Sequence, residues 1–232
     1  MSKQEFTPQS QDFSQLVMEP NKRKTLLIDN NVTRTEDPRD KDFSGVNKSG
    51  TNLRGINLSH ANLKEAYFNG ADLSHANFST AQLQYTDLRG ADLNHANLKG
   101  SKLLAIILNY ADLSYTNFSD AELIQINLSC ADLSHADFSN AHLTYSSLFN
   151  ANLKDANLSH TNLNHSNLSC ADLSNANLSN ADLSSANFSY SNLSGVNFKN
   201  AIVENALFKA NTGLEEDVKL ELQRQGAVFD SF

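Results

Sequence analysis

Residues 171–190 read ADLSNANLSNADLSSANFSY, which is four copies of one five-residue unit. In each copy a small residue is followed by Asn or Asp, then by Leu or Phe, and then by two further residues that are mostly small or polar. The unit repeats without a break from Thr51 to Ala210. Internal repeats of this kind decide the architecture before any local pattern does.

Two positions of the unit are apolar or small throughout. Of the 32 third positions from Leu53 to Phe208, 24 are Leu, seven are Phe and one is Val203. The first position is Ala in 20 of 32 units and is never charged. We therefore expect first and third residues to face inward, with a core that includes Leu73, Phe78, Leu93, Phe118, Leu133 and Phe138.

A period of five fits no straight element. On a helix it advances about 140° per unit, so the Leu residues would spiral around the rod. On a straight strand an odd period places successive Leu residues on opposite faces. The conflict disappears if the chain turns a corner in every unit, at the two positions where Ser, Asn and Gly are common. The repeat therefore predicts an all-β solenoid that winds around its own core.

The length of one coil is indicated by the middle position of the unit. Asp72, Asp92, Asp112, Asp132 and Asp172 share one register modulo 20, and Asn dominates the neighbouring register. Four units, or 20 residues, are therefore expected per coil. The 32 regular units then form about eight coils, and a strand spacing of about 4.8 Å gives a rod roughly 38 Å long.

The pattern resembles the pentapeptide repeat family, whose motif is a small residue, Asn or Asp, Leu or Phe, and two variable positions. Residues 71–75 (ADLSH) and 171–175 (ADLSN) match it throughout, and the resemblance covers 160 of 232 residues. It implies a right-handed, four-sided parallel β-helix. The tail, with GLEED at 213–217 and QGAVF at 225–229, is similar to that of cyanobacterial members.

The two ends leave the repeat and are expected to cap it, because open coils promote end-to-end aggregation. Residues 211–232 contain a predicted helix from Leu214 to Gln225, with Leu214, Val218 and Leu222 on its apolar side. This C-terminal cap is expected to be a lid over the last coil or a homodimer contact. Residues 1–40 are expected to be partly capping and partly mobile, with helical spacing at Phe13, Leu16 and Val17 and a candidate strand at Leu26–Ile28. Residues 41–210 are expected to form the β-helix, with irregular units around Phe43 and Lys48 beginning the first coil.

Composition limits the function classes. The net charge of −8 argues against direct nucleic-acid binding through a basic surface. No run approaches 18 apolar residues, so no membrane span is expected. Cys130 and Cys170, two coils apart, are expected to be free thiols. The expected compartment is cytoplasmic.

A few outward positions break the polar rule and are the candidate interaction surface. Leu104 and Ile124 correspond on adjacent coils, and Ile107 and Phe149 lie on the next face. The strip is expected to bind a protein partner, form a dimer seam or lie beneath the N-terminal segment. The second candidate surface is a ladder of four carboxylates, Asp72, Asp92, Asp112 and Asp132, which is either a solvated face or a rail for cations or a basic protein.

The resemblance also implies an alternative function, because some family members mimic duplex DNA and bind DNA gyrase. His75, His95 and His135 share a column, but residues one coil apart rarely converge on one metal ion, so no metal or cofactor is expected. Catalysis is not expected, because no insertion provides a concave pocket. The leading hypothesis is a non-catalytic structural or protein-interaction scaffold with an unknown protein partner.

Overall fold

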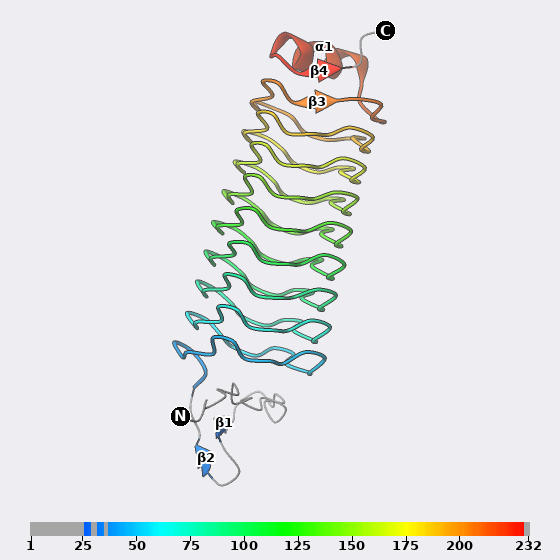
Figure 1. Cartoon of the computed structure of the whole chain (residues 1–232). Coiled ribbons are helices and arrows are strands. Elements are labelled where there is room, and N and C mark those ends of the chain that lie inside the picture. The colour runs from blue at the N-terminus through cyan, green and yellow to red at the C-terminus, as the bar shows by residue number, and fades with distance from the viewer. Residues whose placement is uncertain (1–25, 29–31, 35–36, 230–232) are drawn as a thin grey trace, which may run out of the picture.

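The computed structural model describes residues 26–28, 32–34 and 37–229, and most of this chain forms a stack of coils (Figure 1). Parallel β-bridges join each middle-position residue to the residue 20 positions later, from Asp42 with Asn62 to Asn192 with Thr212. This spacing equals the coil length expected from the Asp register. The irregular units around Phe43 and Lys48 belong to the first coil, as expected.

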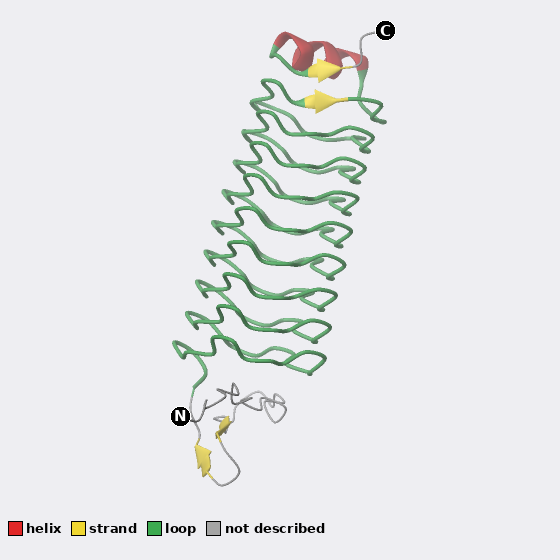
Figure 2. Cartoon of the chain, in the orientation of Figure 1, coloured by secondary structure: helices red, strands yellow, loops and turns green. Residues whose placement is uncertain are grey.

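Each side of a coil contributes a single bridged residue, so the coils are drawn as loops in Figure 2. Backbone hydrogen bonds nevertheless run from coil to coil throughout. Leu73 donates its N–H to the carbonyl of Asp92 at 2.7 Å, and Asp72 donates to Thr51 at 3.0 Å. Because these bonds repeat on all four sides, the backbone polar groups of one coil are satisfied by its neighbours.

The corners are β-turns. Ala76 donates its N–H to the carbonyl of Leu73, three residues earlier, at 3.0 Å. The residue before each such donor has a positive φ, +59° at His75 and +65° at Gly70, as a type II turn requires at its third position. Gly adopts this conformation at no steric cost, whereas other residues cost on the order of 1 kcal/mol.

The core is a continuous column of first- and third-position side chains. All six residues named for it from the sequence have an exposed fraction of 0%: Leu73, Phe78, Leu93, Phe118, Leu133 and Phe138. Aromatic residues in the same column stack, with ring centroids 4.7 Å apart in Phe118 and Phe138. Where the first position is Thr or Ser, the hydroxyl is satisfied by backbone: Thr86 donates to the carbonyls of Leu83 and Leu63.

The C-terminal end of the stack is covered by a short helix and a short strand. Strand β3 (Leu207–Phe208) lies in the last coil and pairs in parallel with β4 (Val228–Phe229). Helix α1 (Glu216–Arg224) lies between them in sequence. Leu222 is buried, and Leu214 and Val218 are partly buried against the core.

The helix is shorter than the expected span from Leu214 to Gln225. Thr212 still bridges Asn192 in coil register, and Glu215 keeps an extended backbone (φ −70°, ψ 147°). Leu214 therefore packs from an extended segment, not from the helix. Gly226, with φ +92°, follows the helix end.

At the other end, β1 (Leu26–Ile28) and β2 (Val32–Arg34) form an antiparallel pair in which Leu26 is opposite Arg34. The strand expected at Leu26–Ile28 is therefore present. The helical spacing of Phe13, Leu16 and Val17 lies outside the described residues.

Candidate interaction surface

The middle-position Asn and Asp side chains have a structural role in the coils. The Oδ1 atom of Asn57 accepts the backbone N–H of Ser59 at 3.2 Å, and the same i to i+2 bond recurs in most units. Asn side chains also bond one another between coils: Asn77 donates to Asn57 at 3.1 Å, and Asn97 donates to Asn77 at 3.2 Å. This turn bond explains why the position is so often Asn or Asp.

The four carboxylates of the Asp ladder are stacked as expected, because Asp72, Asp92, Asp112 and Asp132 bridge one another in sequence. Their side chains do not simply face solvent. Each Oδ1 accepts the N–H of the residue two positions later, at 2.9–3.1 Å. Asp112 is exposed and the other three are half-buried. Part of each carboxylate is thus used within the coil.

Three apolar residues of the candidate strip lie around one corner of the rod. Leu104 is 38% exposed and Ile107 is 39% exposed, on the two sides of the corner residue Ala105. Ile124, one coil further, is half-buried. Phe149 is also exposed but lies apart, because Asn127 and Ser147 follow Ile107 in its column. The structure therefore brings together Leu104, Ile107 and Ile124 and leaves Phe149 separate.

The turns at this corner differ from the others. In a regular turn, such as that of Ile56, the N–H donates to the carbonyl three residues earlier, here Leu53 at 3.0 Å. Among the described residues, the N–H of Ile106 makes no such bond with the carbonyl of Leu103. One coil further, the N–H of Ile126 donates to the Ser146 hydroxyl instead, at 3.2 Å.

Ile at the first position is not by itself the cause, since Ile56 keeps its turn bond. Ile106 and Ile126 instead occupy successive coils of one column, so two large side chains meet where Ala is usual. We attribute the open turns to this crowding.

Three further residues extend this surface, and two of them, Tyr67 and Arg89, were not singled out from the sequence. Tyr67 is 48% exposed and precedes Asp87 and Ile107 in one column, and Tyr85 is 60% exposed at the corner one coil before Ala105. Arg89 reaches back to Asp87. Tyr67 breaks the Asn/Asp rule at the middle position, and that signal was visible in the sequence. We call Tyr67, Tyr85, Arg89, Leu104, Ile107 and Ile124 the corner patch.

An ion pair is built into the patch. The Arg89 Nη2 atom lies 2.6 Å from Oδ2 of Asp87, and its Nε atom donates to Oδ1 at 2.9 Å. Asp87 is buried and Arg89 is exposed. The hydrogen bond from the Arg89 side chain lowers the pKa of Asp87, although burial opposes the shift.

The histidine column forms a stack of rings. His75, His95, Tyr115 and His135 follow one another with centroids 5.0, 4.8 and 4.6 Å apart. Face-to-face stacking directs the ring nitrogens outward at the edges, not toward a common point. Within residues 26–28, 32–34 and 37–229, no group of three or more His, Cys, Asp or Glu side chains is placed to hold a metal ion.

Cys130 and Cys170 are free thiols, as expected, and Asn150 lies between them in the column and donates to the Cys130 sulfur at 3.7 Å. Among the described residues, no helix has the length and apolar character needed to cross a bilayer.

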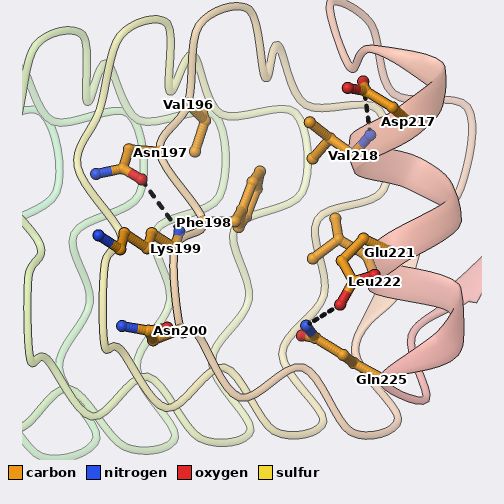
Figure 3. Close-up of a pocket in the computed structure, with 10 residues that line it drawn as sticks. All are labelled: Val196, Asn197, Phe198, Lys199, Asn200, Asp217, Val218, Glu221, Leu222 and Gln225. Atoms are coloured by element: carbon orange, nitrogen blue, oxygen red, sulfur yellow. Dashed lines mark hydrogen bonds between the residues drawn. The ribbon is translucent and has the colours of Figure 1, made fainter.

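A cleft of about 480 Å³ lies at the C-terminal end, between the last coil and α1 (Figure 3). Val196 and Phe198 line it from the coil, and Val218 and Leu222 line it from the helix. Its rim carries Lys199, Asn197, Asn200, Asp217, Glu221 and Gln225. This cleft could not be predicted from the repeat pattern, because it depends on how far α1 stands from the last coil.

Several solved structures are similar to this chain. HetL from Nostoc sp. strain PCC 7120, a pentapeptide repeat protein involved in heterocyst differentiation regulation, is 27% identical over 76% of this chain and 92% of its own, with a TM-score of 0.44. QnrB1, a plasmid-mediated fluoroquinolone resistance protein, is 19% identical over 82% of this chain and 88% of its own, with a TM-score of 0.56. The likeness to QnrB1 shows a shared fold.

A thylakoid lumen pentapeptide repeat protein of Arabidopsis thaliana is 30% identical over 50% of this chain and 78% of its own, with a TM-score of 0.35. No curated protein matches the chain in sequence. The family model for pentapeptide repeats matches eight copies, over residues 42–79, 71–103, 106–144, 146–184 and 166–205. These matches confirm the resemblance read from the units at 71–75 and 171–175, and the chain belongs to the pentapeptide repeat family.

Proposed function

We propose that this chain is a non-catalytic scaffold, a right-handed four-sided rod that binds a protein partner through the corner patch. Family membership supports a structural or interaction role. The observation that carries the proposal is the composition of the patch, in which Tyr67, Tyr85, Leu104 and Ile107 are exposed. Tyr67 and Ile107 flank Asp87 in one column, and Asp87 holds the guanidinium of Arg89. Aromatic residues and Arg are the residue types that dominate binding energy at protein interfaces.

The location of the patch adds support. Most middle positions are Asn or Asp residues that make turn bonds, whereas Ile107 makes no such bond and leaves its side chain outward. The coil thus gives up a local hydrogen bond at the place where apolar surface is exposed. An exposed apolar cluster with no role in the fold is typical of a binding surface.

The test is affinity capture from native lysate, comparing the wild-type chain with the double variant Leu104→Asp/Ile124→Asp. The matched control is Asn164→Asp, since Asn164 occupies the same column two coils beyond Ile124. We expect a specific partner that is retained by the wild type and the control and lost by the double variant. Equal capture by all three chains would refute the patch as the binding site.

The Asp ladder supports one alternative, a DNA-mimicking protein that binds DNA gyrase. Four stacked carboxylates at one-strand spacing provide a line of negative charge. Lys99 and Lys102 interrupt the acidic surface by pairing with Asp120 and Glu122, which weakens this reading. A gyrase supercoiling assay separates the two functions. If the protein at micromolar concentration neither inhibits gyrase nor protects it, the alternative is excluded.

A homodimer through the C-terminal cap also remains a proposal. Leu220 of α1 and Val228 of β4 are 46% and 40% exposed, so the cap offers apolar side chains on its outer surface. Sedimentation of the wild type and of Leu220→Glu/Val228→Glu measures the contact. A wild-type monomer at tens of micromolar would exclude it.

A further inference from the structure

The sides of the last coil have different neighbours at the C-terminal end of the stack. On one side Thr212 bridges Asn192, and on another β4 pairs with β3, so both sides continue the ladder. The side at residues 196–200 faces α1 across the cleft instead (Figure 3). A helix satisfies its own backbone and provides no partners for a β-edge. The ladder therefore stops on this side, as it does at Ile202, which has no bridge to a later residue among the described residues.

One coil earlier, the equivalent backbone groups are all bonded. Leu178 and Asn180 donate their N–H groups to the carbonyls of the next coil, both at 2.9 Å. The carbonyl of Ala176 accepts the N–H of Asn197 at 3.0 Å. Two donors and one acceptor thus define the strand-pairing pattern on this side.

In the last coil the same three groups are the N–H of Phe198, the N–H of Asn200 and the carbonyl of Val196. None of the three has a hydrogen-bond partner within the described part of the chain. An unpaired edge of this kind is a template for adding a strand. The pattern is directional, so an added strand would run parallel to residues 196–200.

The cleft beside this edge is apolar at its base and acidic at its rim. Its volume of about 480 Å³ is within the range of about 300–1,000 Å³ for ligand pockets. In the parallel register, the third residue of an added strand lies over Phe198 and points toward Val218 and Leu222. The cleft therefore suits one bulky apolar side chain.

The rim favours positive charge. Asp217 and Glu221 line the cleft from α1, against the single cation Lys199 from the coil. Arg224 pairs with Glu221 at 3.5 Å on the exposed side, whereas the Asp217 carboxylate bonds only the Val218 N–H among the described groups. Complementary charge at such a rim selects a basic partner.

We propose that this edge is a peptide-binding site, distinct from the corner patch. An extended segment of a partner protein adds as a parallel strand over residues 196–200. It inserts one apolar side chain between Phe198 and Val218, and directs flanking Lys or Arg residues toward Asp217 and Glu221. Strand addition of this kind derives affinity from main-chain bonds and specificity from the pocket.

The test begins with a displayed library of seven-residue peptides that have a central Lys-Leu-Lys, selected on the full-length chain. The chain with Val218→Trp, which fills the cleft, serves for counter-selection. Gln223→Trp is the matched control, because Gln223 is exposed on α1 and does not line the cleft. The best peptide is then synthesised and titrated by fluorescence anisotropy. A second version carries a backbone N-methyl group on the Lys before the Leu, which removes the donor to the Val196 carbonyl.

We expect at least tenfold weaker binding for the N-methylated peptide and for Val218→Trp, and binding within threefold of wild type for Gln223→Trp. Asp217→Lys/Glu221→Lys is expected to weaken binding at least threefold, and this loss should be smaller at high salt because salt screens the charges. Circular dichroism checks that each variant is folded. Leu104→Asp/Ile124→Asp should bind the peptide normally, so failure of this proposal and failure of the corner patch are distinguishable.

Several outcomes would overturn the proposal. The first is that no peptide is enriched on wild type over Val218→Trp, and the second is that N-methylation leaves affinity unchanged. A third is that peptides are enriched on a chain truncated after Phe229 but not on the full-length chain, which would mean that residues 230–232 occupy the cleft. A fourth is a wild-type dimer that Val218→Trp dissociates, which would mean that a second copy occupies it.

Discussion

The coils at residues 151–190 and the corner around Leu104 are built from the same five-residue unit but use it differently. Over 151–190, each middle position is Asn or Asp, and each turn has its hydrogen bond, such as Ala176 to Leu173 at 2.9 Å. At the corner, Ile107 replaces the Asn or Asp, and the turn bonds of Ile106 and Ile126 are missing or rerouted. The unit tolerates such losses on the outside while its core stays buried.

This difference separates two kinds of constraint. Ala and Leu in the regular coils are fixed by packing, because neighbouring coils leave no room for other sizes. The outward residues at the corner contribute little to packing and give up turn bonds. Stability is therefore expected to depend on the inside equally in both regions. Of these two regions, only the corner is expected to bind a partner through its outer surface.

The largest effect is expected from opening the core. Phe138→Ala removes a fully buried ring that stacks on Phe118 at 4.7 Å, and should lower the free energy of unfolding by about 3–5 kcal/mol. Leu104→Ala, at the exposed corner, should lower it by less than about 1 kcal/mol. Urea denaturation measures both. Comparable losses for the two variants would contradict the separation of inside and outside.

A smaller effect is expected from relieving the crowding at the corner. Ile126→Ala restores the usual small residue and should lower the free energy of unfolding by about 2 kcal/mol. This value is at the low end for Ile→Ala, because neighbouring side chains can close the space that is left. The N–H of Ile106 should then bond to Leu103 and exchange more slowly with solvent. Amide hydrogen exchange tests this, with Ile56→Ala as the control, because Ile56 already has its turn bond. Unchanged exchange at Ile106 would show that crowding is not the cause.

Most of the coil architecture follows from the sequence. The Leu73 and Phe78 positions and the 20-residue register of Asp72 and Asp92 are enough to place residues inside or outside and to align the coils. The reason is physical: a strict period allows one arrangement that buries all third positions. The predicted helix start, Leu214, lies two residues before the observed start at Glu216. The reason is that Thr212 still follows the coil register, while the apolar spacing from Leu214 already predicts a helix.

The candidate site was less predictable. Leu104, Ile107 and Ile124 could be named because they break the polar rule. The ion pair between Asp87 and Arg89 could not, because Asp is the expected residue at that position and only geometry shows its burial. The cleft beside Phe198 depends on the position of α1, which no repeat specifies.

The ion pair provides a pH test of the corner. Arg89 lowers the folded-state pKa of Asp87 below its usual value of 3.8, so the pair stabilises the protein fully above that value. This contribution is lost as pH falls through the lowered pKa. Wild type should exceed Asp87→Asn in unfolding free energy by at most about 1 kcal/mol at pH 7, with the difference disappearing toward pH 2. Arg89→Gln should behave in the same way, and a difference independent of pH would exclude the pair as its source.

The smallest effects are expected at the turn residues, where regular and irregular coils share one conformation. Gly90 and Tyr110 occupy the same corner column with φ near +60°, and a Cβ added at Gly90 would meet nothing within 4 Å. Gly90→Ala therefore tests backbone strain alone and should cost about 1 kcal/mol. Tyr110→Asn should raise the free energy of unfolding by about 0.5 kcal/mol, because Asn tolerates positive φ better than Tyr. Thermal unfolding measures both, and a loss in Tyr110→Asn would mean that the exposed ring stabilises the coil through contacts that outweigh the strain.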